Sequence, residues 1–213
     1  MASDSYPAQR ERAELCDLFA EVGPDAPTLC GEWTTRDLAA HLVVRERRPD
    51  AAVGIVVSKA AGYTDKVQAG VAEAEWGDLI DSVRSGPPIW SPTRLAAIDK
   101  ATNTIEFFVH HEDVRRAVDG WQPRELDADL DEALSSMLSK MAKRLVKSSP
   151  VGIVLEPTGR PRIVAKQAEP SVTVSGAVGE LVLFAFGRQA HSRVELAGDD
   201  ASVAAVNAAS FGI

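Results

Sequence analysis

The chain has 213 residues, of which 45% are hydrophobic and 25% are charged, a balance typical of a folded globular protein. Its formal net charge of -8 argues against a general nucleic-acid binder, which normally carries a basic surface. No run of about 18 apolar residues predicts a membrane span, and the N-terminus lacks the basic-then-apolar plan of a signal peptide. We therefore expect a cytoplasmic protein that binds neither nucleic acid nor membrane.

The sequence contains two cysteines, Cys16 and Cys30, and they do not form a C-x-x-C pair. Such sparse cysteine usage predicts reduced thiols rather than a disulfide framework. Cys30 lies close before a predicted helix and is a candidate for partial exposure and reactivity.

Helical periodicity covers the first two thirds of the chain. Apolar residues recur at helical spacing in segments near residues 8–22, 34–48, 51–61, 65–84, 99–117 and 129–147. Thr34 or Thr35 can cap the second helix, and the arginines near its end (Arg45, Arg47 and Arg48) suit a helix C-terminus. The proline-rich segment 85–92 is predicted to be a loop, either a plain connector or the mouth of a site.

The pattern changes after Pro150, where short β-branched runs separated by turn residues predict strands. A helix, a further strand and a closing helix are predicted to follow. We therefore predict an α+β protein, with a helical domain over residues 1–148 and a small mixed domain over 149–213.

The segment 99–117 carries the spacing that suggests chemistry, Glu106-x-x-x-His110. On a helix, six polar residues fall on one narrow stripe with apolar neighbours on both sides: Asp99, Thr102, Asn103, Glu106, His110 and Asp113. Such a stripe faces inward, where carboxylates and imidazoles are costly unless they are paired or bound to a metal. From this helix alone, a buried Glu–His hydrogen bond and a metal site are both possible.

The opposite side of the same helix is predicted to face solvent. It carries one phenylalanine among mostly polar residues, which are Lys100, Thr104, His111, Glu112 and Arg115. His111 is therefore interpreted as an ordinary histidine, and His110 as the candidate ligand.

His41 lies in the middle of the second helix, next to apolar residues. A lone histidine in such a place is usually a core residue, but two antiparallel helices of a bundle can place it opposite Glu106 and His110. Two imidazoles and one carboxylate leave a coordination position open, as in catalytic zinc sites. Zinc is our first choice, although non-haem iron, nickel and manganese also suit these ligands.

Two motifs point to a known family: Trp33-x-x-x-Asp37-Leu38-x-x-His41 and Glu106-x-x-x-His110. With them the chain resembles the mycothiol-dependent maleylpyruvate isomerase N-terminal family, within the DinB-like metal-binding four-helix bundles. The resemblance implies that His41, Glu106 and His110 bind a divalent metal, commonly zinc. It covers residues 1 to about 148, and the C-terminal part is similar in pattern to the family's sterol carrier protein-like domain.

The resemblance also implies a thiol cofactor, mycothiol, whose sulfur becomes a thiolate on the metal, and a small electrophilic substrate. It further implies an arginine from the C-terminal domain that holds substrate carboxylates, for which Arg188 is the best candidate. Asn103 lies one turn from Glu106 and is a candidate for orienting the bound water or the Glu106 carboxylate.

Two classes of function remain open. The first is a thiol-linked transferase or isomerase, and the second is a non-catalytic protein that is stabilised by the metal and binds a small ligand. A fourth protein ligand, such as His111 or Asp113, would favour the second class. The sequence does not indicate the substrate or the oligomeric state.

Overall fold

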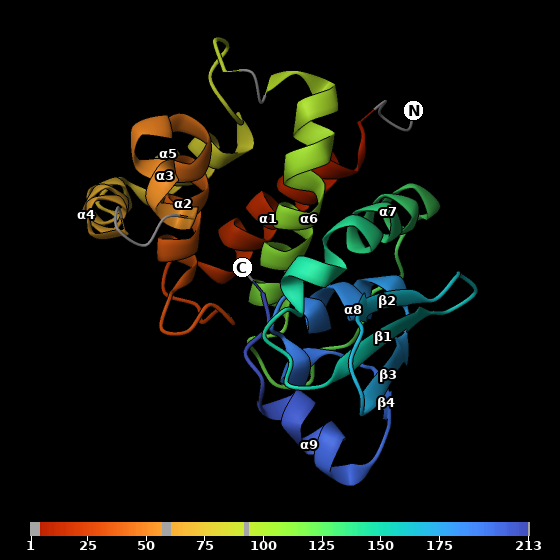
Figure 1. Ribbon diagram of the computed structural model, residues 1–213. Coiled ribbons are helices and arrows are strands. Elements are labelled where there is room, and N and C mark those ends of the chain that lie inside the picture. The colour runs from red at the N-terminus through yellow and green to blue at the C-terminus, as the bar shows by residue number, and fades with distance from the viewer. Residues whose placement is uncertain (1–4, 57–60, 92–93, 213) are drawn as a thin grey trace. The chain divides into compact units, whose positions relative to one another are not determined.

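The structure of the chain is a computed structural model that describes residues 5–56, 61–91 and 94–212. The chain forms two compact units, Met1–Trp121 and Gln122–Ile213. Helices make up the first unit, and a four-stranded sheet with helices makes up the second (Figure 1). The predicted mixture of helix and sheet is therefore confirmed.

The first unit contains six helices within the described residues, close to the predicted segments. They are α1 (Pro7–Val22), α2 (Thr35–Arg47), α3 (Pro49–Val56), α4 (Ala61–Ala72), α5 (Trp76–Arg84) and α6 (Ala96–Arg115). The end of the predicted helix 51–61 lies partly outside the described residues. The prediction of one helix over 65–84 was wrong, because α4 ends at Ala72 and α5 begins at Trp76. The Arg36 guanidinium donates to the carbonyl groups of Ala72 and Ala74 at 2.9 and 2.8 Å, and so satisfies carbonyls at this break.

A capping box fixes the start of α2. Thr34 is the N-cap, its side chain accepts from the Asp37 backbone N–H, and its own N–H donates to the Asp37 carboxylate at 2.9 Å. Thr35, the other candidate cap, instead donates its hydroxyl to the carbonyl of Gly23. Because the box fixes where the helix begins, it also fixes the direction in which His41 points.

The core of the first unit draws apolar side chains from α1, α2, α5 and α6, including Leu15, Phe19, Leu38, Leu79 and Phe107. α1 packs along α6. The predicted solvent face of α6 was wrong in part, since Thr104, His111 and Glu112 are buried. Packing of α1 against α6 explains the burial of His111, whose Nδ1 lies 3.2 Å from Glu11 of α1. The buried Glu112 carboxylate is paired with Arg115 and Arg116.

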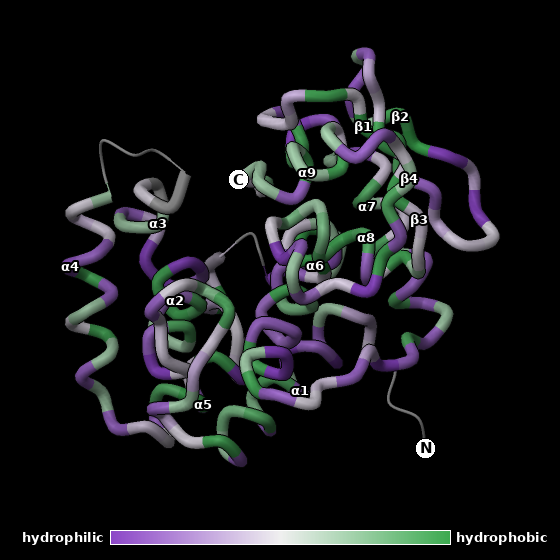
Figure 2. Tube along the Cα trace, turned by 90° about the horizontal axis from the view of Figure 1, so that it is seen from below, coloured by the Kyte–Doolittle hydropathy of each residue, from purple (hydrophilic) through white to green (hydrophobic). Residues whose placement is uncertain are grey.

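The second unit contains α7 (Ala128–Leu145), β1 (Gly152–Pro157), β2 (Ile163–Lys166), β3 (Ser171–Gly176), α8 (Val178–Ala185), β4 (Glu195–Ala197) and α9 (Asp200–Ala208). The strand order is β2-β1-β3-β4, in which β1 and β3 are parallel and the outer pairs are antiparallel. Every residue of α8 is buried, and hydropathy colouring marks this helix as mostly hydrophobic (Figure 2). It therefore forms the centre of the core of this unit.

The helix α7 belongs to the second unit, although the predicted boundary near residue 149 would have placed it in the first. It packs against α8 and β2. Its apolar face (Leu130, Leu134, Leu138 and Leu145) is buried there. Periodicity identified this helix but could not show which apolar surface it would cover.

Among the described helices, none has the length and hydrophobicity that a membrane crossing requires.

Candidate metal centre

His41 on α2 and the pair Glu106 and His110 on α6 come together in the first unit. The Nε2 atoms of His41 and His110 lie 3.5 and 3.4 Å from the same Glu106 oxygen, Oε1. The two imidazole rings are 5.4 Å apart and nearly perpendicular. One ligand atom from each of the three residues lies within 4.8 Å of the other two.

These separations suit a metal better than direct hydrogen bonds. A charge-assisted hydrogen bond would bring the atoms to about 2.7–2.9 Å. Bonds of 2.0–2.1 Å to a tetrahedral metal place neighbouring ligand atoms about 3.4 Å apart. The donor set of two imidazoles and one carboxylate therefore suits a divalent ion in chemistry, and the two separations from Glu106 Oε1 match this spacing.

The surroundings keep the Glu106 carboxylate ionised. Burial alone would raise its pKa, but its contacts with His110 and His41 and the charge of Arg45 hold the pKa well below its usual range. The pKa of His41 is lowered, chiefly by burial, so its imidazole is neutral at pH 7 and able to bind a metal. The pKa of His110 is raised well above its usual value, against the effect of burial, by Asp113, Cys30 and Glu106.

Arg45 supports the carboxylate from the side of α2. Its Nε lies 3.1 Å from Glu106 Oε1, and its two terminal nitrogens donate to Asn103 Oδ1 and to the Thr102 carbonyl at 2.5 and 3.0 Å. These contacts hold the guanidinium in place beside the cluster. Asn103 is therefore linked to Glu106 by Arg45, which contacts both side chains. The amide nitrogen of Asn103 donates to Glu46 and Asp99.

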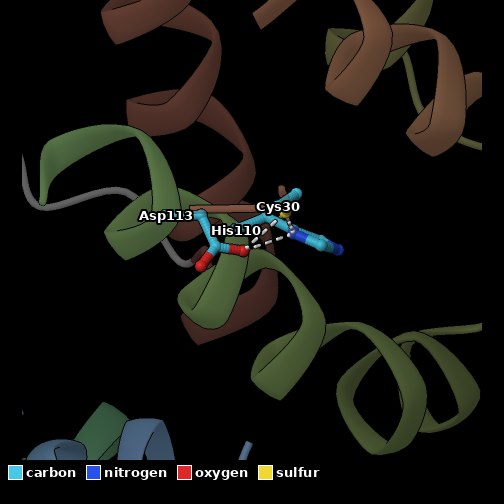
Figure 3. Close-up of side chains that lie close together, drawn as sticks. All are labelled: Cys30, His110 and Asp113. Atoms are coloured by element: carbon cyan, nitrogen blue, oxygen red, sulfur yellow. Dashed lines mark hydrogen bonds and ion pairs between the residues drawn. The ribbon is translucent and has the colours of Figure 1, made fainter. Parts of the chain in front are cut away.

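The other ring nitrogen of His110 faces Asp113, a fully buried carboxylate. Nδ1 lies 2.9 Å from Asp113 Oδ2, and the Cys30 thiol donates to the same oxygen at 3.1 Å (Figure 3). A carboxylate can only accept a hydrogen bond, so Nδ1 carries the hydrogen and Nε2 is directed toward Glu106. Asp113 thus has the position of an outer-shell partner of a metal-binding histidine.

Two further groups of potential ligands occur among the described residues. Cys30, His110 and Asp113 form one, but their 2.9 and 3.1 Å contacts are hydrogen-bond lengths. The other joins His111 to two glutamates of α1, with Nδ1 at 3.2 Å from Glu11 and 3.9 Å from Glu14. His111 and Glu11 are both buried, so their 3.2 Å contact is explained as a hydrogen bond that satisfies both groups within the helix interface.

Arg188, the predicted carboxylate-binding residue, belongs to the second unit. It follows α8, and its guanidinium donates to the Phe186 carbonyl at 2.6 Å. Its role toward a substrate stays a prediction.

Arg45 was not predicted to be a neighbour of the cluster. Arg45 was assigned to the C-terminal turn of α2, where it does lie, but its spacing of four residues from His41 places both on one face. Asp113 was considered as a fourth ligand, whereas it contacts the far nitrogen of His110. Its spacing of three residues from His110 is the signal for this contact.

Comparison with known proteins gives likeness in fold alone. No family model matches the sequence, and no curated protein matches it. Among solved structures, the crystal structure of the mycothiol-dependent maleylpyruvate isomerase covers 91% of each chain, with a TM-score of 0.63 and 14% sequence identity. A histidine-to-alanine mutant of that isomerase also covers 91% of each chain, with a TM-score of 0.57 and 16% identity. The chain is thus similar in fold, over most of its length, to the mycothiol-dependent maleylpyruvate isomerase.

Proposed function

We propose that His41, Glu106 and His110 bind one divalent metal ion, with zinc as the first choice, and that the protein is a metal-dependent thiol transferase or isomerase. The thiol is a low-molecular-weight one, of which mycothiol is the main candidate. The substrate is a small electrophile that carries a carboxylate.

The observation that carries the proposal is the convergence of two imidazole Nε2 atoms on one carboxylate oxygen at 3.4–3.5 Å. Three protein ligands leave room for a thiol or water, which is the pattern of catalytic rather than structural zinc sites. Within the described part of the chain, the cluster contains no fourth histidine, cysteine or carboxylate ligand. Iron, nickel and manganese remain candidates because they accept the same ligands.

The residues around the cluster have separate tasks in this proposal. Asp113 orients His110 and raises the basicity of its imidazole. Arg45, whose Nε lies 3.1 Å from Glu106 Oε1, adds to the contacts with His110 and His41 that keep Glu106 ionised. A bound divalent metal supplies positive charge that stabilises a thiolate at neutral pH. Arg188 is proposed to bind the substrate carboxylate with its guanidinium.

The likeness in fold to the mycothiol-dependent maleylpyruvate isomerase supports the choice of thiol and of reaction class. We further propose that the helical unit corresponds to a DinB-like four-helix bundle, since α1, α2, α5 and α6 supply its core. The second unit, including α7, would then correspond to the sterol carrier protein-like domain.

Cobalt substitution tests the thiol step. We expect mycothiol to produce a thiolate-to-metal charge-transfer band with the cobalt protein, whereas its S-methyl derivative, which has no ionisable thiol, should not. The Arg188→Ala variant should keep the band but lose the response to a carboxylated substrate, and Arg162→Ala is a matched control because Arg162 is an exposed arginine of the same unit.

The alternative is a non-catalytic protein that the metal stabilises and that binds a small ligand. If no thiol changes the cobalt spectrum and Arg188→Ala leaves every ligand response unaltered, this alternative replaces the thiol-enzyme proposal.

A further inference from the structure

The first unit contains a polar cavity that lies toward the N-terminal end of α6. Its volume is about 330 Å³, and it is lined by residues from α1, from the end of α5 and its loop, and from the start of α6. His41, Glu106 and His110 are not among its lining residues. The cavity is therefore a separate place from the proposed metal centre.

Two buried charged residues, Arg12 and Asp99, line this cavity, and both have partners within the protein. Arg12 donates to both oxygens of Glu46 at 2.6 Å and to the Val83 carbonyl at 2.9 Å. Asp99 accepts from the Tyr6 hydroxyl at 2.7 Å. Because these buried groups satisfy one another's hydrogen-bonding capacity, we do not expect them to bind a ligand.

The lining also includes two exposed arginines, Arg84 and Arg94, which form the rim of the cavity. Each uses one guanidinium nitrogen in a side-chain contact within the described residues. Arg84 uses one nitrogen, Nη2, to contact Asp17 at 2.7 Å in an exposed pair, and such pairs contribute little stability. Arg94 uses one nitrogen, Nη1, to contact the Pro87 carbonyl at 2.9 Å. Among the residues that the structure describes, no carboxylate pairs with Arg94.

We propose that this cavity, the Arg84/Arg94 cavity, binds a small organic anion through its carboxylate or phosphate group. Two guanidinium groups at one rim provide forked donors that match these groups in geometry. The lining also includes Gln9 and Ser85, which can add neutral hydrogen bonds, and Ala13 and Pro87, which offer apolar contact. The volume far exceeds the roughly 30 Å³ that one water occupies in the liquid, so there is room for an organic body as well as the charged group.

The test uses benzoate and phenyl phosphate as probes and benzamide as the neutral analogue of benzoate. Binding is followed by NMR shift titration of the full chain. We expect saturable binding of an anion, and none of benzamide. Arg84→Gln and Arg94→Gln should each weaken binding about tenfold, which corresponds to the loss of one charge-assisted interaction. A preference for one of the two anions identifies the headgroup.

Two controls separate this cavity from general charge effects and from the metal centre. Arg162→Gln removes an exposed arginine of the second unit, and His110→Ala removes a proposed metal ligand. Both should bind the probe as the unmodified protein does. The proposal is overturned if no anion binds saturably, if benzamide binds as well as benzoate, if both rim variants keep full affinity, or if His110→Ala abolishes binding.

Discussion

The polar stripe of α6 has two halves, and their side chains are arranged in different ways. In the N-terminal half, Asp99 and Asn103 contact each other at 2.5 Å, and Asn103 also donates to Glu46 at 2.9 Å. In the C-terminal half, the ligand atoms of Glu106 and His110 stay 3.4 Å apart and face a third ligand, His41. The first half is a closed network, and the second resembles a set of ligands.

The difference shows that residue type alone does not separate a structural polar cluster from a binding site. Carboxylates and their partners occupy both halves, on one helix face, in the same core. In the closed network, hydrogen bonds near their ideal length satisfy each group, so a further ligand would have to replace them. In the second half, Asp113 and Arg45 contact His110 and Glu106 at 2.9 and 3.1 Å, but the two contacts between a histidine Nε2 and Glu106 are longer than strong hydrogen bonds. This spacing is compatible with three ligands around one ion.

The largest expected effect is the loss of metal from the C-terminal half. His110→Ala should abolish stoichiometric metal, because it removes one of three ligands. His111→Ala, one residue along, should retain it. Elemental analysis of the purified variants, with circular dichroism as a check on folding, measures both. Equal loss of metal in the two folded variants would contradict the assignment.

Cys30→Ala provides a second control for the same assignment. The Cys30 thiol donates to Asp113 at 3.1 Å and lies 3.8 Å from His110 Nδ1, which is not the nitrogen that faces Glu106. The variant should therefore hold metal at the same stoichiometry. Loss of metal from this variant would favour the group formed by Cys30, His110 and Asp113.

The next effect is on stability and belongs to the N-terminal half. Arg12→Ala should lower the free energy of unfolding by about 3–5 kcal/mol, because it leaves the buried Glu46 carboxylate without its partner. Urea denaturation of the metal-free protein measures this change. Arg162→Ala, at an exposed pair, should change stability by less than about 0.5 kcal/mol. A small change in the free energy of unfolding of Arg12→Ala would contradict a stabilising role for the Arg12–Glu46 pair.

Loss of the Asp113 contact should weaken the metal centre without abolishing it. Asp113→Asn removes the carboxylate that orients His110, and outer-shell changes of this kind cost about 10–100-fold in metal affinity. Competition with a chromophoric chelator at pH 8 measures the affinity. An unchanged affinity would show that Asp113 does not support the ligand.

The smallest effect is a shift in the pH dependence of metal binding. Because the pKa of His110 is raised, its proton competes with the metal at a higher pH than the proton of an ordinary histidine with a pKa of about 6.5. Affinity should therefore fall as pH falls through this raised pKa, by up to about tenfold per unit. In Asp113→Asn the fall should begin at lower pH. Chelator competition across pH 5–8 checks this, and identical profiles would refute it.

Sequence alone was informative where local rules decide structure. Outside the predicted helix 65–84, which is divided between α4 and α5, the helices and strands follow the predicted segments, since periodicity and turn residues act over short distances. The stripe of α6 was also predictable, because a helix fixes which residues share a face. Glu106 and His110 were paired on this basis, whereas His41 was added from the geometry of a helix bundle and from the family resemblance. The structure brings the three side chains together.

Tertiary structure decided the remainder. Periodicity identified α7 but not the surface of α8 and β2 that it covers, which set the unit boundary at Trp121 rather than near residue 149. It also gave no sign that His111, which contacts Glu11 of α1, and Glu112 would be buried. Whether a polar side chain is satisfied by neighbours or left facing a ligand depends on distances between helices that are far apart in sequence. Local patterns therefore determined the elements and the face of α6, and only packing decided which half of that face closed into a network and which half remained available for a metal.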